Sequence, residues 1–432
     1  MREMKDSGIF DGVEIPATWD IMKFGKVCSI VTDFVASGSF ADLRENVPYL
    51  SEPDYAMLVR TTDLAKTARS EGKVYISKAS YEFLSNSNLF GGEIVLPNIG
   101  SIGDVYVVPK LYERMSLAPN SIMFKTRYCD KYYYYYFLCK VGGLQLSEIS
   151  QSTAMAKFNK TDLKQIRVFL PSLAEQQKIV EFLDRKCAEV DEMIGLQEQI
   201  IEELKAYKQS VITEAVTKGL NPDVPMKDSG IEWIGQIPEH WEVRRGKNVL
   251  VLQKRPVRDN DEVVTCFRDG EVILRSLRRT EGFTMSDKEI GYQGINEGDI
   301  VIHGMDGFAG AMGVSKSTGK GSPVLVVCSP KYDAVPQYIV YYLRALAIMD
   351  VFVSLATGIR ERSCDLRWNK ISELPFVLPL PKEQQAIADY LDEKCADIDS
   401  LIQTKQSKID SLKEYKKSII YEYVTGKREV DE

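Results

Sequence analysis

Two long stretches of the chain, 170–220 and 378–432, place apolar residues in a sustained alternation of three and four positions. Heptads kept up over about five repeats predict a long helix that pairs with another helix as a coiled coil. Polar residues interrupt the apolar pattern at equivalent positions of the two stretches, for example Lys208 in the first and Lys416 in the second. Such residues commonly fix the register of a coiled coil. We expect the apolar seam to contain Leu183, Cys187, Val190, Ile194, Ile201, Leu204 and Val211 in the first helix and Leu391, Cys395, Ile398, Ile402, Ile409, Leu412 and Ile419 in the second.

The two helical stretches are copies of one sequence. Residues 170–218 and 378–426, aligned without a gap at an offset of 208, are identical at 23 of 49 positions, which indicates an internal duplication. A second repeat, MKDSGI, begins at Met4 and again at Met226. The alternative is that the helices are unrelated amphipathic helices, each packed on a separate core.

The segments between these repeats differ strongly in sequence but share a plan. GGEIVLPNIGSIGDVYVV from Gly91 and EGDIVIHGMDGFAGAMGVS from Glu297 both read as a strand, a glycine-rich turn and a strand. The tyrosine run at 132–136 has a helically spaced counterpart at 338–342, which favours a packed helix over a base-stacking platform. We therefore expect an α+β fold in which two similar globular domains are joined by two long antiparallel helices related by a pseudo-two-fold repeat. The expected parts are 1–169, a first domain with its junction segment; 170–220, a long helix; 221–377, a second domain; and 378–432, a second long helix.

Composition narrows the class of protein. The chain has 432 residues, of which 44% are hydrophobic and 27% charged, as in soluble globular proteins with more than one domain. No apolar run is long enough to span a bilayer, and eight cysteines without metal-binding spacing favour a reduced, cytoplasmic setting. A net charge of −7 weighs against a nucleic-acid partner, but it does not describe any single face.

Together these features resemble the specificity (S) subunits of Type I restriction-modification systems. The resemblance covers essentially the whole chain and lies in the twice-placed motif LPxxxEQQxIxxxLDxKCAxxD, the LK.YK.S.I.E.VT helix ends and the MKDSGI junction. It implies a non-catalytic chain whose two target-recognition domains each read one half of a bipartite double-stranded DNA target. It also implies that the helices set the spacer and dock two methyltransferase (M) subunits, with restriction (R) subunits joining for cleavage. No cofactor is then expected in this chain, S-adenosylmethionine belonging to the M subunit and ATP and Mg to the R subunit.

Candidate DNA contacts come from polar loops and basic clusters, since Arg, Lys and small polar residues are the usual readers of bases and phosphates. SQSTAMAKFNK and TGIRERSCDLRW precede the two long helices by the same distance, and a basic stretch occupies 244–279. A solvated charged face is the simpler alternative for the basic stretch, and simple turn geometry for the glycine turns. The candidates are Arg60, Thr61, Ser101, Ser152, Thr153, Lys157, Arg275, Arg278, Arg279, Arg360, Arg362 and Arg367.

Neither catalysis nor metal binding is expected. His240 and His303 are the only histidines, and no convincing Ser-His-Asp or Cys-His set can be built from them. The competing function is a coiled-coil adaptor that joins two protein partners without binding DNA. Charge reversal at Arg360 and Arg362 discriminates the two hypotheses, because an adaptor would tolerate it.

Overall fold

Each half of the duplicated sequence forms a compact unit in the computed structural model. The first unit comprises Met1–Leu196 and Lys408–Glu432, and the second comprises Gln197–Ser407. Each unit thus holds one globular domain with a stretch of both long helices, while the domain boundaries expected from sequence stay a prediction. The structure describes residues 2–65, 72–150, 156–278, 290–354 and 366–430.

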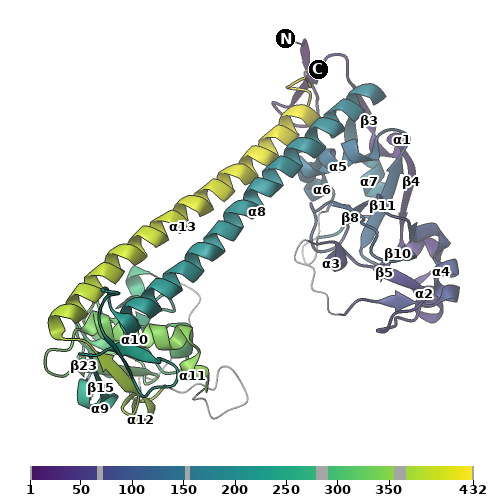
Figure 1. Ribbon diagram of the computed structural model, residues 1–432. Helices are drawn as coiled ribbons and strands as arrows, with labels where there is room; N and C mark the ends of the chain where they lie inside the picture. The colour runs from purple at the N-terminus through teal and green to yellow at the C-terminus, as the bar shows by residue number, and fades with distance from the viewer. Residues whose placement is uncertain (1, 66–71, 151–155, 279–289, 355–365, 431–432) are drawn as a thin grey trace. The chain divides into compact units, whose positions relative to one another are not determined.

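The two long helices, α8 (Leu173–Lys218) and α13 (Pro381–Val424), run side by side in opposite directions within each unit (Figure 1). The Ser172 hydroxyl accepts the Glu175 amide at 3.3 Å at the start of α8, and Pro381 opens α13, where its missing N–H costs nothing. The expected α+β fold with two paired antiparallel helices is confirmed. Of the expected seam residues, Ile194, Leu204 and Ile402 are half-buried; Leu183, Cys187, Val190, Ile201, Val211, Leu391, Cys395, Ile398, Ile409, Leu412 and Ile419 are buried.

Two lysines interrupt the apolar seam and pair across it. In the second unit the Lys208 ammonium contacts the Asp399 carboxylate at 2.7 Å, and in the first unit Lys416 contacts Asp191 at the same distance. Lys416 stands 208 positions after Lys208, and Asp399 stands 208 positions after Asp191, so the two ion pairs are copies of each other. Each pair ties the same levels of the two helices together and so defines their register.

The first domain is built on two four-stranded sheets. The main sheet is antiparallel, with the order β4-β11-β8-β9, and the second, β6-β5-β10-β7, contains a parallel pair of β5 and β10. Its elements are β4 (Cys28–Asp33), β5 (Ala56–Val59), β6 (Tyr75–Ile76), β7 (Asn88–Leu89), β8 (Ile94–Pro97), β9 (Tyr106–Val107), β10 (Met115–Leu117), β11 (Ser121–Thr126), α1 (Phe24–Val27), α2 (Phe40–Asn46), α3 (Thr61–Leu64), α4 (Lys78–Phe83), α5 (Asp130–Leu138), α6 (Lys140–Ile149) and α7 (Lys160–Gln165), with single 3-10 turns η1 (Phe34–Ser37) and η2 (Ser85–Ser87).

The second domain repeats the main sheet but not the second one. The antiparallel order β16-β23-β20-β21 corresponds to that of the first domain, whereas two antiparallel strand pairs, the hairpin β17-β18 and the sequence-distant pair β19-β22, replace the mixed sheet. Its elements are β16 (Leu250–Leu252), β17 (Val264–Cys266), β18 (Val272–Leu274), β19 (Gln293–Ile295), β20 (Ile300–His303), β21 (Met312–Val314), β22 (Gly319–Gly321), β23 (Leu325–Pro330), α9 (Gly246–Val249), α10 (Pro336–Ile348), α11 (Val351–Ser354) and α12 (Trp368–Ile371), with 3-10 turns η3 (Arg275–Leu277) and η4 (Gly307–Ala309).

The MKDSGI repeats form equivalent hairpins at the entry to each domain. Met4 pairs with Pro16 in the first, and Met226 pairs with Pro238 in the second, so the different loop sequences leave the register unchanged. Each hairpin leads into a short strand that pairs with the strand just before the long helix. The strands are β1 (Met4–Asp6), β2 (Glu14–Pro16), β3 (Asp20–Lys23) and β12 (Arg167–Leu170) in the first unit and β13 (Met226–Asp228), β14 (Gln236–Pro238), β15 (Glu242–Arg245) and β24 (Pro375–Leu378) in the second.

A glutamate in the first turn of each long helix holds the domain entry. The buried Trp19 indole donates its N–H to Glu175 at 2.9 Å, and the buried Trp241 indole donates to Glu383 at 3.1 Å. A tryptophan can be fully buried at low cost only when its N–H has such a partner.

The next residue, a buried glutamine, bridges the helix to the domain through both ends of its amide. The Gln176 amide accepts the backbone N–H of Cys129, at the start of α5, and donates to the Pro171 carbonyl. Gln384 makes the same two hydrogen bonds with Val335, at the start of α10, and with Pro379. The EQQ motif is therefore the joint between helix and domain.

The tyrosine-rich helices α5 and α10 are packed against both long helices. Tyr135 donates to Asp184 of α8 at 2.7 Å, and Tyr132, on the same helix, donates to the Val424 carbonyl of α13. In the second unit Tyr341 donates to Asp392 at 2.6 Å. Burial removes these rings from any base-stacking role, as the helical spacing predicted. In the part of the chain that the structure describes, no helix is both long and apolar enough to cross a membrane.

The ion pair between Lys208 and Asp399 should contribute measurably to helix pairing. We expect Lys208→Glu to lower the free energy of unfolding by roughly 1 kcal/mol, because it removes an attraction and sets two carboxylates side by side. The double exchange Lys208→Glu with Asp399→Lys should recover most of the loss in urea unfolding followed by circular dichroism. Lys413→Glu, at an exposed position of α13, is the charge-matched control. Equal losses in the single and double variants would refute the pairing.

Candidate nucleic-acid interface

In the first domain, the turn after strand β8 and the segment before α7 lie side by side. The Phe158 N–H donates to the Asn98 carbonyl at 3.1 Å, and the Asn98 side-chain amide donates to the Phe158 carbonyl at 3.0 Å. Ile99 forms an antiparallel bridge with Lys157, whose side chain is exposed, as is that of Ser101 in the same turn. Two candidates that are far apart in sequence, Ser101 and Lys157, are thus brought to one edge of the domain.

The second domain makes the same connection. The Leu366 N–H donates to the Gly304 carbonyl at 2.8 Å, so that exposed Arg367 lies beside the turn after strand β20. Leu366 is buried, and one of its methyl groups lies 2.6 Å from where a side-chain carbon on Gly307 would sit, so Gly307 is required for this close approach. We call residues 98–103 with 156–159, and 304–310 with 366–368, the turn-loop sites of the two domains.

Polar contacts brace the turn of the second turn-loop site. The Arg268 guanidinium pairs with Asp306 at 2.8 Å, and the Asp306 N–H donates to Nδ1 of His303 at 3.0 Å. Burial lowers the pKa of His303, which keeps its ring neutral and Nδ1 available as an acceptor. His303 is thereby assigned to holding the turn.

Arg60 and Thr61 lie at the end of a buried strand of the second sheet. Arg60 follows β5 and binds both oxygens of Asp63 with its guanidinium, at 3.0 and 2.8 Å, while Thr61 is the first residue of α3. The bond to Asp63 raises the pKa of Arg60 and fixes the direction of the side chain. Arg60 keeps partial exposure, so it remains a candidate for a phosphate contact.

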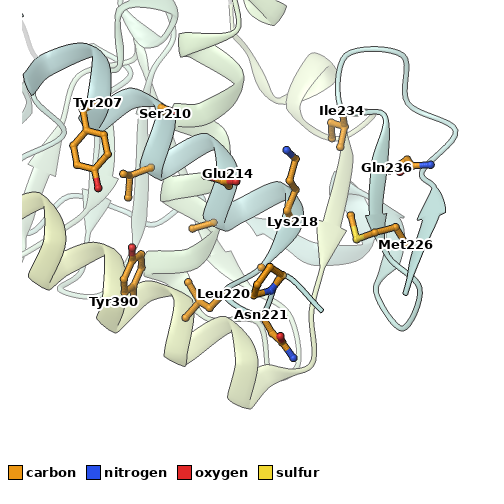
Figure 2. Close-up of a pocket in the computed structure, with 14 residues that line it drawn as sticks. Tyr207, Ser210, Glu214, Lys218, Leu220, Asn221, Met226, Ile234, Gln236 and Tyr390 are labelled. Carbon is orange, nitrogen blue, oxygen red and sulfur yellow. The ribbon is translucent and has the colours of Figure 1, made fainter. Parts of the chain in front are cut away.

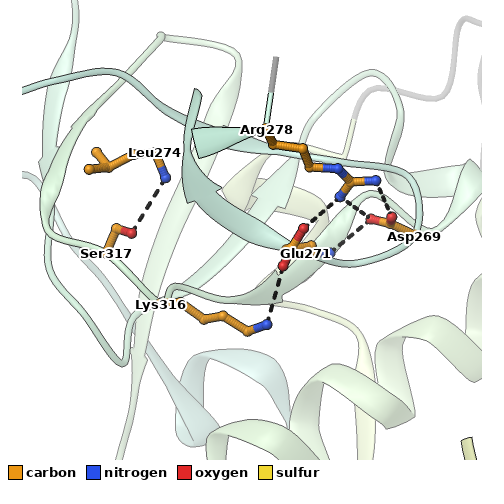
Figure 3. A network of polar contacts seen from close by, with 6 residues as sticks. All are labelled: Asp269, Glu271, Leu274, Arg278, Lys316 and Ser317. Carbon is orange, nitrogen blue, oxygen red and sulfur yellow. Dashed lines mark hydrogen bonds and ion pairs between the residues drawn. The ribbon is translucent and has the colours of Figure 1, made fainter. Parts of the chain in front are cut away.

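One arginine of the basic stretch in the second domain, Arg278, is bound by two acids of the same stretch. Arg278 pairs with Asp269 and with Glu271, and Glu271 also contacts Lys316 at 3.3 Å (Figure 3). The Arg278 guanidinium lies 4.2 Å from the centre of the Phe267 ring. These contacts close the β17-β18 hairpin.

Arg275, three residues earlier, donates to the Thr265 hydroxyl of the same hairpin at 3.1 Å. The structure therefore gives both arginines a role in holding the hairpin, and their contact with DNA stays a prediction. The predicted residues Ser152, Thr153, Arg279, Arg360 and Arg362 lie outside the described part of the chain.

Sequence reasoning missed the residues that join each turn to its loop. Asn98 and Leu366 carry the hydrogen bonds that bring the two candidate segments together, and neither was among the predicted site residues. The acids Asp63 and Asp269 were missed as well. Asp63 could have been found from the sequence, because an acid three residues after the N-cap of a helix commonly accepts a hydrogen bond from the N-cap backbone N–H.

Comparisons with known proteins agree with this architecture. Residues 16–206 match the family model of the Type I restriction modification DNA specificity domain. The Type I restriction enzyme MjaVIII specificity subunit of Methanocaldococcus jannaschii is 25% identical over 96% of this chain and 94% of its own length. The EcoBI specificity subunit of Escherichia coli is 27% identical over 63% of this chain and 61% of its own length.

Two solved structures share the fold. One, from work on complex assembly and conformational transition of the type I R-M system, has a TM-score of 0.68 at 14% identity and covers 95% of this chain and 98% of its own. The HsdS subunit of Thermoanaerobacter tengcongensis has a TM-score of 0.53, also at 14% identity, over 97% of this chain and 99% of its own.

The chain belongs to the DNA specificity subunits of Type I restriction-modification systems. It is thus a non-catalytic subunit of a family that carries no cofactor itself. Specificity for a DNA target and assembly into a Type I complex are the properties that this membership establishes.

Lys157 should contact a DNA phosphate from the first turn-loop site. We expect Lys157→Ala to weaken DNA binding of the assembled complex at all sequences alike and to lower the slope of log K against log salt by about 1, as for one lost phosphate contact. Fluorescence anisotropy over a salt series measures both quantities. Lys110→Ala, at the opposite end of the β8-β9 hairpin, should leave the slope unchanged; an unchanged slope in Lys157→Ala would exclude the contact.

The bond between Arg278 and Asp269 should give the second domain a pH-dependent stability. The hydrogen bond from Arg278 lowers the pKa of Asp269 below its ordinary value of about 3.9. The stabilisation is therefore complete above pH ~4 and lost as the pH falls through the lowered value. Thermal unfolding between pH 7 and pH 3 should show a smaller acid-side decrease in Asp269→Asn than in the wild-type chain. Parallel curves would show that this carboxylate does not contribute.

Proposed function

We propose that each domain reads one half of a bipartite double-stranded DNA target through its turn-loop site. The observation that carries this proposal is the same join in both domains, Asn98 to Phe158 and Gly304 to Leu366, between a turn and a polar loop. Each site presents an exposed cation, Lys157 or Arg367, beside a turn that the backbone holds in place. Such cations position a protein on phosphates and can reach the base edges of the major groove.

The two halves of the target should differ in sequence. The main sheets and the turn-loop sites correspond, but the mixed sheet of the first domain is replaced by two antiparallel strand pairs in the second. Among the residues that the structure describes, Arg60 therefore has no structural counterpart in the second domain, and the β17-β18 hairpin has none in the first. Different polar side chains around a common site favour two unlike half-sites.

The long helices would set the distance between the half-sites. The 46 residues of α8 rise about 69 Å along the axis of a straight helix. This length is about two turns of B-DNA, each about 34–36 Å. A spacer of fixed length between the half-sites follows.

Methyltransferase and restriction subunits would supply the chemistry. Two M subunits, which carry S-adenosylmethionine, would dock on the duplicated helices, and R subunits with ATP and Mg would join them in the cytoplasm. A partner that binds twice needs a surface that occurs twice. The repeated helix sequences provide it, since they match far better than the domain middles do.

Methylation mapping tests the proposal directly. The chain is co-expressed with the M subunit encoded beside it, and methylated adenines are located across the host genome by single-molecule sequencing. We expect one motif with two dissimilar halves at a fixed spacing. Replacing both Lys157 and Arg367 by alanine should reduce methylation of that motif, whereas the Lys110→Ala control should not. A stable complex that methylates no motif would favour the adaptor function.

A further inference from the structure

One face of the helix pair carries exposed apolar residues at repeated positions. Met193 and Tyr207 of α8 are 42% and 54% exposed, and their counterparts 208 positions later, Leu401 and Tyr415 of α13, are 50% and 51% exposed. All four residues occupy the same heptad position, which flanks the apolar seam. Asp184 and Asp392, which bind tyrosines of the domains, flank the seam on its other side. The described residues of the domains thus leave these four side chains exposed.

Each unit presents one tyrosine and one aliphatic residue on this face. The ion pair of Asp191 with Lys416 places Met193 at the level of Tyr415 in the first unit. The ion pair of Lys208 with Asp399 places Tyr207 at the level of Leu401 in the second. Exposed aromatic and aliphatic pairs of this kind are typical anchors of protein interfaces.

In the second unit a groove continues from this face to the domain entry. It has a volume of about 600 Å³ and runs from Tyr207 along the end of α8 to the β13-β14 hairpin, with Tyr390 of α13 on the opposite side (Figure 2). We call it the junction groove. Its apolar lining consists of Tyr207, Val211, Ala215, Leu220, Pro222, Met226, Ile234 and Tyr390.

The corresponding place in the first unit is occupied by an aromatic stack. Tyr423 stands where the second unit has Ala215, and Phe182 stands where it has Tyr390. The rings of Phe182 and Tyr423 lie 4.2 Å apart, and Tyr423 is buried. A tyrosine side chain thus fills the space that the small Ala215 leaves open in the second unit.

We propose that the two docking sites for M subunits are unequal, and that the junction groove makes the site on the second unit the stronger one. The groove would take an apolar side chain of the first M subunit to bind, while the second subunit would rely on the exposed Tyr415 and Met193 alone. This inference rests on the proposed docking of two M subunits. The occupant follows from continuity, because the groove opens beside Tyr207, one of the residues that occur twice.

Native mass spectrometry of the full-length chain titrated with its M subunit tests the inequality. We expect a 1:1 complex to accumulate before the 2:1 complex, with stepwise affinities that differ by roughly tenfold, the effect of one well-buried anchor. Ala215→Tyr copies the residue of the first unit into the groove. It should weaken the first step by a similar factor, to the level of the second step, and leave the second step unchanged.

A second variant that fills the junction groove and a matched control complete the experiment. Met226→Trp fills the groove from the hairpin and should act like Ala215→Tyr, so that a folding defect in one variant does not decide the outcome. Ala396→Tyr adds the same side chain at an exposed position of α13 and should bind M subunits like the wild type. Thermal unfolding verifies that each variant is folded.

The possible failures are distinguishable. Wild-type steps that differ only by the statistical factor for two equal sites, or a first step that neither groove variant weakens, would overturn the inequality while two M subunits still bind. Absence of any complex between the wild-type chain and the M subunit would instead overturn the docking on which the inference rests. An equal loss in Ala396→Tyr would show that the effect does not come from the groove.

Discussion

The joint between each long helix and its domain depends on two adjacent side chains, a glutamate and a glutamine. The carboxylates of Glu175 and Glu383 allow a tryptophan to be buried whole, and the amides of Gln176 and Gln384 satisfy one backbone group on either side of the joint. Buried polar groups are costly when any partner is missing. The geometry of the joint is therefore strongly specified, and the positions of the sheet and the turn-loop site within each unit follow from it.

The helices and the repeat were predictable because their signals are local. Heptad spacing indicates which residues face a partner helix, and a second copy identical at 23 of 49 positions indicates that both stretches share one structure. The reciprocal pairs of Lys208 and Lys416 were foreseen only as interruptions of the seam. Their partners, Asp399 and Asp191, could not be identified, because antiparallel register is set by side chains distant in sequence.

The candidate site was predictable in outline and not in detail. The glycine turns and the polar loops were recognised as separate candidates, whereas their contact depends on Asn98 and Leu366, which carry no compositional signal. The arginines around Arg278 were predicted to contact DNA for a different reason, namely their density in the sequence. Counting cations along a sequence cannot show that Asp269 and Glu271 already bind one of them, and only the fold brings these groups together.

The repeated parts of the chain form the joints, whereas the unrepeated parts form the domain middles, and this separation affects how the sequence can evolve. Each domain meets the long helices through α5 or α10, the entry strands and the EQQ joint, all present in both units. The mixed sheet and the two strand pairs that replace it are not among these shared contacts. A gene segment encoding only a domain middle could therefore be exchanged with that of a related chain without disturbing the joint. One recombination event would then change the DNA specificity of the complex and leave the repeated helices and joints of the chain unchanged.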